Sequence, residues 1–322
     1  MNTPRLLITE PKDYAQEALD LLCPKFDLDF GPLTRAELKN KIGCYDGVLV
    51  RLGHKFDREL LTSATKLKFI ASPTTGLNHV DIKTTEENNI AVLSLKGEVE
   101  FLNNIYATAE HCWGLLLSLL RHIPKAHNSV SQGNWNRDEF KAYELHDKTL
   151  GIIGCGRLGR KIAGYANAFG MTVIAYDPFV NDVENVEFVD SLNALAERAD
   201  VVIVHCSYSD QTHHLLDADF FNAMKRHALF INTARGEIID EQALFDALEN
   251  KKIAGVALDV LAGENSLSKQ DFSDYLKEKT KAFNNLIITP HVGGATYESM
   301  AKTEIFIAQK ICKFFDETDF AT

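Results

Sequence analysis

Proline, glycine and basic residues are all scarce in this 322-residue chain. It has 8 prolines and 19 glycines, and it shows no repeat period, which excludes collagen-like and low-complexity proteins. Lysine and arginine number 34 against 45 aspartates and glutamates, so the net charge is −11 and the pI is near 5.5. A surface of that sign repels a phosphate backbone, and we therefore expect no general binding to nucleic acids.

Paired cysteines and long apolar segments are missing as well. The six cysteines form no CxxC pair, and a chain of this length needs no disulfides, so we expect reduced, mostly buried thiols and a cytoplasmic location. The N-terminal segment has no long apolar stretch and meets Pro11 early, unlike a signal peptide. The most apolar helical segment, Ile105–Leu120, carries charge and is too short to cross a bilayer, so no membrane association is expected.

The remaining composition and pattern are typical of a soluble α/β protein. Charged residues make up 25% and hydrophobic residues 45%, and at about 150 residues per domain the length predicts two domains. Ten candidate strands are Arg5–Thr9, Gly47–Arg51, Leu67–Ala71, Ile90–Ser94, Thr149–Ile153, Met171–Tyr176, Asp200–Cys206, Ala228–Asn232, Ile253–Asp259 and Leu286–Thr289. Most are continuous apolar runs separated by helical patterns, which indicates parallel sheets covered on both faces.

The strands divide unevenly around a long helix that begins near Asn104. Four strands precede this helix and six follow it, which predicts a smaller N-terminal α/β domain and a larger one from about Asn103 to Val292. The stretch His127–Tyr143 is polar and is expected to be irregular. The last helix, Glu298–Phe315, is amphipathic and could pack on either domain.

A glycine-rich turn follows the strand Thr149–Ile153. Gly154, Gly156 and Gly159 form a GxGxxG pattern between a strand and a helix, the context in which backbone N–H groups and a helix N-terminus receive a pyrophosphate. The next strand ends at Asp177, 18 residues after Gly159. A carboxylate there accepts hydrogen bonds from an adenosine ribose and repels a 2′-phosphate, which favours NAD over NADP. The alternative is that the glycines merely cap a helix.

Three later strands each run into polar residues that suit catalysis. Arg235 follows FINTA, Glu264 follows ALDVLAG, and His291 lies in IITPHVGG. Because ligands bind outside the carboxyl ends of strands in doubly wound sheets, these three side chains are candidates for one site. Taken singly, each also fits an ordinary surface residue.

These motifs together resemble the D-isomer-specific 2-hydroxyacid dehydrogenases, a family that includes phosphoglycerate, glycerate and D-lactate dehydrogenases. The resemblance covers essentially the whole chain and rests on the glycine turn, N-x-A-R-G at 232–236, A-L-D-V at 257–260 and T-P-H-V-G-G at 289–294. It implies a flavodoxin-like substrate (catalytic) domain from residues 1–102 and 293–322. It also implies a Rossmann NAD-binding domain from residues 103–292, and a homodimer formed through residues 104–143.

The resemblance further implies an NAD-dependent oxidoreductase that interconverts a D-2-hydroxy acid and its 2-keto acid. Arg235 would hold the substrate carboxylate as a bidentate pair. His291 would be the general acid in reduction and the general base in oxidation. Glu264 would hydrogen-bond His291, orient its ring and favour the protonated imidazole.

The implied binding residues fall into two sets. Those for the cofactor are Gly154, Gly156, Arg157, Leu158, Gly159, Asp177, His205, Thr233, Asp259 and Gly294. Those for the small-molecule substrate are Arg51, Thr75, Gly76 and Lys96. Arg51 could instead be a plain surface residue, and Lys96 could pair with Glu98 or Glu100. No cysteine or carboxylate spacing predicts a metal site.

Several departures from the family pattern bear on the substrate. Asn265 stands where the family usually has proline after the glutamate, and the segment Ser266–Asn285 is long and charged. Ser72 replaces an arginine found in some phosphoglycerate enzymes, and formate dehydrogenases carry glutamine where Glu264 stands. The link Ser94–Asn103 also looks about three residues longer than usual. The competing function is a nucleotide-sensing corepressor on the same fold, and which 2-hydroxy acid is used stays open.

Overall fold

The chain forms two compact units, each an α/β domain. The computed structural model describes residues 3–264 and 268–318. Unit 1 comprises Met1–Ile105 with Ala295–Thr322, and unit 2 comprises Tyr106–Gly294. The sequence-based division placed the two boundaries after residues 102 and 292. The α/β class and the parallel sheets predicted from the apolar runs are confirmed.

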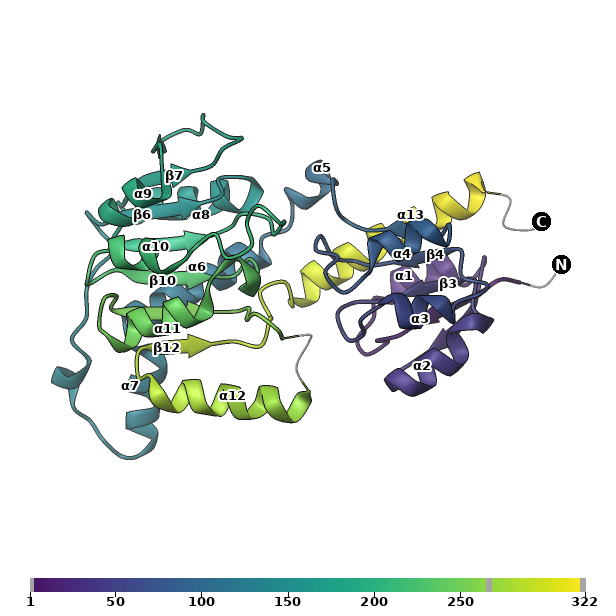
Figure 1. Cartoon of the computed structure of the whole chain (residues 1–322), viewed down its shortest axis with the longest axis horizontal. Coiled ribbons are helices and arrows are strands. Elements are labelled where there is room, and N and C mark those ends of the chain that lie inside the picture. The colour runs from purple at the N-terminus through teal and green to yellow at the C-terminus, as the bar shows by residue number, and fades with distance from the viewer. Residues whose placement is uncertain (1–2, 265–267, 319–322) are drawn as a thin grey trace. The chain divides into compact units, whose positions relative to one another are not determined.

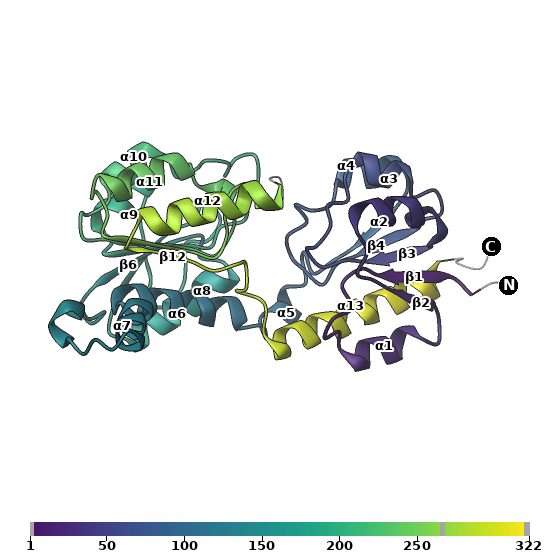
Figure 2. The same ribbon diagram turned by 90° about the horizontal axis from the view of Figure 1, so that it is seen from below.

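Unit 1 contains a five-stranded parallel sheet with the order β2-β1-β3-β4-β5. Its strands are β1 (Arg5–Ile8), β2 (Asp27–Phe30), β3 (Gly47–Leu49), β4 (Phe69–Ala71) and β5 (Ala91–Leu93). This order is that of flavodoxin-like folds. Helices α2 (Arg35–Lys41), α3 (Arg58–Thr62) and α4 (Ile82–Glu87) cover one face, and α1 (Gln16–Leu22) and α13 (Tyr297–Glu317) cover the other (Figure 2).

The last helix therefore packs on unit 1. Ile307, Ala308 and Ile311 of α13 are fully buried in the same cluster as Leu6 and Ile8 of β1. The sequence left this choice open because an amphipathic helix indicates that one face is covered without saying by what. The two ends of the chain thus build one unit.

Unit 2 contains a seven-stranded parallel sheet with the order β12-β11-β10-β9-β6-β7-β8. Its strands are β6 (Thr149–Ile153), β7 (Thr172–Tyr176), β8 (Glu187–Phe188), β9 (Val201–Val204), β10 (Leu229–Asn232), β11 (Gly255–Leu258) and β12 (Leu286–Ile288). The strand order reverses between β6 and β9, which is the topological switch point of a Rossmann fold. A dinucleotide is expected to bind at that point.

Helices cover both faces of this sheet (Figures 1 and 2). On one face lie α6 (Ala107–Leu120), α7 (Ile123–Ser131) and α8 (Arg157–Ala168). On the other lie α9 (Leu192–Arg198), α10 (Ala218–Ala223), α11 (Glu241–Glu249) and α12 (Lys269–Ala282). Short helical turns are α5 (Val99–Leu102) and the 3₁₀ segments at Ile42–Cys44, Arg137–Phe140 and Gly236–Ile238.

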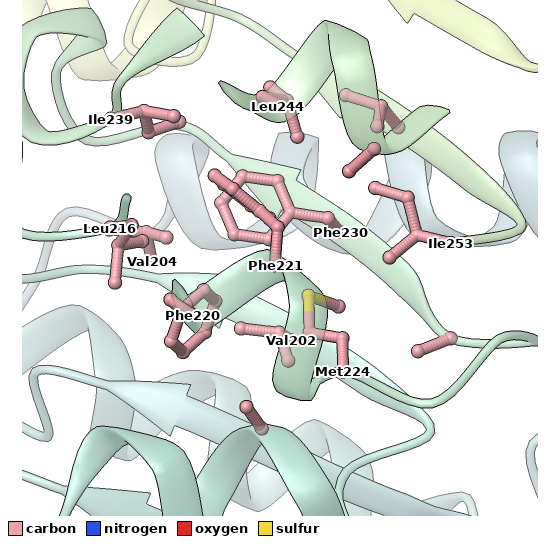
Figure 3. Packing of buried hydrophobic residues seen from close by; sticks show 14 of the residues in the cluster. Val202, Val204, Leu216, Phe220, Phe221, Met224, Phe230, Ile239, Leu244 and Ile253 are labelled. Atoms are coloured by element: carbon pink, nitrogen blue, oxygen red, sulfur yellow. The ribbon is translucent and has the colours of Figure 1, made fainter. Parts of the chain in front are cut away.

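An aromatic cluster packs between the sheet of unit 2 and the helices α10 and α11 (Figure 3). The rings of Phe221 and Phe230 meet edge to face, with centroids 5.3 Å apart, and both are buried among Val202, Leu244 and Ile253. Such packing fixes α10 and α11 against β9, β10 and β11. The loops at the carboxyl ends of these strands are therefore supported by rigid elements.

Some elements differ from the sequence-based expectation. The ten expected strands all form, but β2 and β8 were not expected, because DLDF and EF are short and polar edge segments. The stretch 127–143, which was expected to be irregular, overlaps α7. None of the nine residues of α7 is buried. The long charged segment after Glu264 contains α12; Asn265 itself lies outside the described residues.

Candidate functional site

The glycine turn at the switch point is tightly constrained. Gly154 has φ of +90°, and a Cβ there would lie 2.4 Å from the backbone nitrogen of Cys206. A Cβ on Gly159 would lie 2.4 Å from the carbonyl oxygen of Gly154, whereas one on Gly156 would point into open space at the start of α8. Two glycines thus permit close packing, and the third leaves room beside a helix N-terminus. That is the cradle that a pyrophosphate needs.

Asp177 closes this turn from the end of β7. Its Oδ2 accepts a hydrogen bond from the N–H of Cys155 at 2.8 Å. Its Oδ1 accepts from the N–H groups of Phe179 at 2.8 Å and Val180 at 3.1 Å. The sequence predicted a carboxylate next to the glycine turn, and the chain brings the two together.

Cys155 and His205 line the same turn as neutral groups. Burial raises the pKa of the Cys155 thiol to about 11, which is consistent with a small packing residue rather than a reactive thiolate. Burial, with the charge of Arg157, lowers the pKa of His205 to about 3. Neither ring nitrogen of His205 hydrogen-bonds to any residue that the structure describes. A buried polar ring without partners beside a phosphate cradle fits a site that a dinucleotide completes.

The other residues expected at the cofactor lie along the same edge of the sheet. Arg157 and Leu158 form the first turn of α8, and burial lowers the pKa of Arg157. Thr233 is buried directly after β10, Asp259 is buried directly after β11, and Gly294 is the last residue of unit 2. All ten expected positions therefore belong to unit 2, and they fit a bound dinucleotide.

Arg235 projects from a locked turn after β10. The side chain of Asn232 donates to the carbonyl oxygen of Arg235 at 2.8 Å and accepts from the N–H of Ala234 at 2.9 Å. Burial lowers the pKa of Arg235, while the nearby carboxylates of Glu264 and Glu237 oppose that shift. A mostly buried guanidinium in this setting is placed to bind a planar anion such as a carboxylate.

The turn of Arg235 is packed directly against the turn that carries Glu264. A Cβ on Gly236 would lie 2.0 Å from the carbonyl carbon of Leu261 and 2.1 Å from the nitrogen of Ala262. The glycine of the N-x-A-R-G motif is therefore required by this contact. It brings two loops that are 29 residues apart in sequence to one place.

Glu264 and His291 form the central pair of the site. Nδ1 of His291 lies 2.6 Å from Oε1 of Glu264, and both side chains are mostly buried. Nε2 of His291 makes no hydrogen bond within residues 3–264 and 268–318. The carboxylate fixes the ring through one nitrogen and leaves the other available for proton transfer.

Asp259 holds the turn on which His291 sits. His291 has φ of +53°, in the left-handed region that a non-glycine residue rarely adopts. The carboxylate of Asp259 accepts from Thr289 Oγ1 at 2.6 Å, Val292 N at 2.9 Å, Gly293 N at 2.7 Å and His111 Nε2 at 3.2 Å. Burial opposes its ionisation, but the hydrogen bonds outweigh burial and lower its pKa. Its expected role in cofactor binding stays a prediction.

Sequence reasoning did not identify the supporting residues of this turn. His111 of α6 hydrogen-bonds to Thr289 at 3.0 Å as well as to Asp259. Glu241 of α11 accepts the N–H of Ala262, two residues before Glu264. Neither could be found from spacing, because α6 and α11 reach the turns through tertiary packing.

The residues expected at the substrate lie in unit 1, and Arg51 has protein partners there. Its guanidinium donates to the carbonyl oxygen of Lys12 and pairs with the carboxylate of Glu304, which is fully buried on α13. It also lies over the ring of Tyr14, at 5.3 Å. Arg51 is therefore tied into its own domain, and its role toward a substrate stays a prediction.

Thr75 and Gly76 lie in a braced loop with free N–H groups. Ser72 contacts Thr74 at 2.8 Å and His79 at 3.3 Å, and Thr74 donates to the carbonyl oxygen of Gly76 at 2.8 Å. The N–H groups of Thr75 and Gly76 make no hydrogen bond to any residue of the described chain. Such a loop can offer backbone donors to a carboxylate.

Lys96 is exposed on the link between β5 and α5. Glu98, one of its two possible partners, is instead paired with Lys310 of α13 at 2.6 Å. Among the described residues Lys96 forms no ion pair. The adjoining Gly97 has φ of +87° and open space at its Cβ position.

The remaining sequence-based expectations concern cysteines, metals and membranes. Cys112 and Cys155 are buried, Cys206 and Cys312 are half-buried, and Cys23 and Cys44 are exposed; all six are free thiols. Among the described residues no group of three His, Cys, Asp or Glu side chains could hold a metal ion. Within the same residues no helix has the length and apolar character needed to cross a membrane.

Comparisons with known proteins agree with this geometry. The family described as "D-isomer specific 2-hydroxyacid dehydrogenase, NAD binding domain" matches residues 113–293. A hydroxypyruvate reductase of Thermotoga maritima is 33% identical over 312 residues, which cover 96% of this chain and 97% of that protein. A D-3-phosphoglycerate dehydrogenase of Methanocaldococcus jannaschii is 34% identical over 314 residues, which cover 96% of this chain and 57% of that protein. The chain thus spans a little more than half the length of the phosphoglycerate dehydrogenases that it matches.

A solved structure is also similar to this chain. The D-lactate dehydrogenase of Aquifex aeolicus, complexed with NAD and lactic acid, superposes with a TM-score of 0.83 at 28% identity, covering 97% of this chain and 95% of that one. The fold and the site define a two-domain α/β protein with a Rossmann dinucleotide-binding unit. The chain belongs to the D-isomer-specific 2-hydroxyacid dehydrogenase family, and unit 2 is the NAD-binding domain of that family.

Proposed function

We propose that the protein is an NAD-dependent D-2-hydroxyacid dehydrogenase that interconverts a D-2-hydroxy acid and its 2-keto acid. The observation that carries the proposal is the 2.6 Å pair of His291 and Glu264 at the carboxyl edge of the NAD-binding sheet, in loops adjoining Arg235. A histidine oriented by a carboxylate, next to a buried guanidinium, is the set of groups that this reaction requires.

Arg235 binds the substrate carboxylate in this proposal. Its planar donors match the two oxygens, and its positive charge polarises the adjacent carbonyl. Such a bidentate pair would place the carbonyl carbon in a defined orientation. The N–H groups of Thr75 and Gly76, which are free of hydrogen bonds within the described chain, are separately proposed as donors to a substrate carboxylate.

His291 moves the proton. In reduction, Nε2 donates a proton to the carbonyl oxygen as that oxygen gains negative charge, and in oxidation it takes the proton back. Glu264 keeps Nδ1 hydrogen-bonded throughout, and so stabilises the charged imidazolium. The nicotinamide supplies or receives the hydride, so a 2-keto acid, NADH and a proton give a 2-hydroxy acid and NAD⁺.

The substrate class is an extension of this proposal. The relative matched along nearly its full length is named a hydroxypyruvate reductase, so hydroxypyruvate is the first candidate. We propose a substrate larger or more anionic than pyruvate, because Lys96 offers an unpaired ammonium on the link before α5. Arg51 is a weaker candidate, since Glu304 already neutralises it.

We also propose a cytoplasmic homodimer. The arm that follows α6 exposes large apolar side chains, with exposed fractions of 91% for Trp135 and 71% for Tyr143. Such residues are enriched in interface cores, and two-fold symmetry is the commonest arrangement of oligomers.

The test is oxidation of NADH by the purified protein with a panel of 2-keto acids. Pyruvate, hydroxypyruvate, 2-ketoglutarate and phosphohydroxypyruvate are compared, and the chirality of the product is determined. We expect turnover with at least one of them and a D-configured product. Tight NADH binding without turnover of any 2-keto acid would instead favour the nucleotide-sensing corepressor.

A further inference from the structure

The long charged segment after Glu264 contains a helix that packs onto unit 2. Phe272, Tyr275 and Leu276 of α12 contact the main core cluster. Just after the helix, Phe283 stacks on Phe245 of α11, with ring centroids 5.6 Å apart and an interplanar angle of 11°. Figure 1 shows α12 running beside β12 and α11. The segment is thus an integral part of the domain.

In addition to this apolar packing, α12 makes a polar contact with α11. The hydroxyl of Tyr275 donates to Oε2 of Glu241 at 2.8 Å. Oε1 of the same glutamate accepts the N–H of Ala262, two residues before Glu264. Glu241 is partly buried, and it therefore bridges α12 and the turn 261–264 through both of its oxygens.

The turn 261–264 depends on such external contacts. Its own hydrogen bonds are long: the N–H of Glu264 lies 3.4 Å from the carbonyl oxygen of Leu261, and the N–H of Leu261 lies 3.5 Å from Oε2 of Glu264. The backbone of Gly236 packs against the turn, and the carboxylate of Glu241 accepts the N–H of Ala262 within it. Loss of the bridge would free the segment from which Glu264 reaches His291.

The ionised form of Glu241 is favoured by its two hydrogen-bond donors, Ala262 and Tyr275. Burial raises the pKa of Glu241, and the neighbouring carboxylates of Glu237 and Glu264 add to that shift. The hydrogen bonds from Ala262 and Tyr275 oppose it and favour the carboxylate. If the tyrosine hydroxyl is removed, the carboxylate loses one of its two donors, and its hold on the turn weakens.

We propose that Tyr275 and Glu241 are positioning residues that set the turn 261–264 and thereby the Glu264–His291 pair. In this proposal they act through the turn and not by direct contact with substrate or cofactor. The proposal rests on the proposed dehydrogenase function for its catalytic consequence. It extends that function by assigning a role to α12, the helix in the segment whose length departs from the family pattern.

The test uses Tyr275→Phe, Glu241→Ala and Glu241→Gln in the full-length protein. Tyr297→Phe and Glu249→Ala are the matched controls, because both side chains are exposed and neither takes part in the bridge. We expect Tyr275→Phe and Glu241→Ala to lower kcat about 5- to 50-fold with less than about threefold change in the KM for the 2-keto acid, on the general-acid scale. The basic limb of the pH–kcat profile should move to lower pH. Glu241→Gln, which keeps an oxygen for Ala262, should recover most of the loss.

A second readout does not depend on turnover. Amide hydrogen exchange of the peptide that contains residues 261–264 should accelerate in Tyr275→Phe and Glu241→Ala, while exchange in β10 and β11 stays unchanged. The double variant Tyr275→Phe with Glu241→Ala should resemble Glu241→Ala alone, because both changes remove one bridge. The controls should match the wild type in exchange and in kcat.

The outcomes separate this proposal from the proposed function. If exchange at 261–264 and the pH profile are both unchanged, the bridge does not position Glu264. If exchange accelerates across the whole of unit 2 together with a loss of melting temperature, the contacts are merely structural, and the proposal is also overturned. An inactive wild type refutes the dehydrogenase function, while the exchange experiment still decides whether the bridge holds the turn.

Discussion

Nδ1 of His291 lies 2.6 Å from Oε1 of Glu264, although 27 residues separate them in the sequence. The contact exists because β11 and β12 are parallel neighbours, so the loops at their carboxyl ends emerge at one edge of the sheet. Asp259 holds the histidine turn, and Gly236 packs beneath the glutamate turn. The pair is thus positioned by rigid strands rather than by the loops alone.

Replacing His291 by alanine should lower kcat at least about 100-fold, the usual scale for loss of a general acid. The affinity for NADH should hardly change, because the proposed partner of the imidazole is the substrate carbonyl and not the cofactor. Steady-state kinetics and fluorescence titration with NADH give the two quantities. His146→Ala is the control, because this histidine is exposed and lies far from His291 in the sequence. Near-normal turnover in His291→Ala would move the acid role to another residue.

NADH should be preferred to NADPH, because we expect the carboxylate of Asp177 to face the position of a 2′-phosphate. Asp177→Ala should narrow the ratio of kcat/KM between the two cofactors. It should also weaken NADH binding, since Asp177 accepts the N–H of Cys155 in the glycine turn. Asp182→Ala, at an exposed carboxylate nearby in sequence, should leave the ratio unchanged. Equal kcat/KM for both cofactors in the wild type contradicts this prediction.

The sequence predicted those parts of the fold and the site that depend on short-range pattern. Apolar runs locate ten of the twelve strands in the described part of the chain, and motifs locate the glycine turn, Arg235, Glu264 and His291. Strand β2 was not predicted because its DLDF sequence lies at a sheet edge, where apolar burial is partial. The bridge through Glu241 was not predicted for a different reason. Its partners lie 21 and 34 residues away in sequence, and tertiary packing alone brings them together.

The same limit explains why the sequence could not settle the role of Arg51. Its position at the end of an apolar strand predicts a residue at the substrate edge of unit 1. That its guanidinium pairs with a buried carboxylate depends on α13 returning from the far end of the chain to the same sheet. No feature of the sequence near residue 51 indicates that Arg51 pairs with Glu304.

Asp200 should stabilise unit 2 in a pH-dependent way. Burial disfavours its charge, but the N–H of Thr149 and the side chains of Lys225 and His227 outweigh burial and lower its pKa to about 2. Because the folded pKa lies below the ordinary value of about 3.9, the stabilisation is present above pH 4 and is lost as the pH falls toward 2. After discounting for partial exposure, it is on the order of 1 kcal/mol.

Asp200→Asn measures this contribution. The free energy of unfolding of the variant should be lower than that of the wild type at pH 7, and the gap should shrink between pH 4 and pH 2. Urea unfolding followed by fluorescence gives both values. Asp219→Asn, at an exposed aspartate, is the control. A gap that stays constant from pH 7 to pH 3 would show that Asp200 acts through packing rather than through its charge.

The protein should be a homodimer through the arm that contains α7. None of the nine residues of α7 is buried in the single chain, while Ile123 and Val130 leave about half of their surfaces exposed. Light scattering should give about twice the chain mass of 36.0 kDa. Trp135→Glu should lower the dimer affinity, whereas Phe179→Glu, at an exposed aromatic residue outside the arm, should not. A monomer mass at micromolar concentration would contradict the assignment.

Lys96 should favour substrates with a second anionic group. Glu98 cannot neutralise it, because that carboxylate pairs with Lys310 at 2.6 Å. Gly97 beside it leaves open space at its Cβ position. An exposed ammonium on a loop can attract a distal carboxylate or phosphate without affecting the reacting carbonyl. Lys96→Ala should therefore lower kcat/KM about 3- to 20-fold for phosphohydroxypyruvate or 2-ketoglutarate, mainly through KM, and should hardly affect pyruvate.

Lys83→Ala, on α4 of the same unit, provides the matched control for loss of one exposed positive charge. The comparison is made at low and at physiological salt, since screening weakens a long-range attraction more than a direct contact. If Lys96→Ala changes kcat/KM equally little for all four 2-keto acids, the ammonium does not contact the substrate. If pyruvate is the best substrate of the wild type, the preference for a larger or more anionic acid is wrong. In either case the roles proposed for Arg235, Glu264 and His291 are unaffected, because those roles concern the carboxylate and carbonyl that all four acids share.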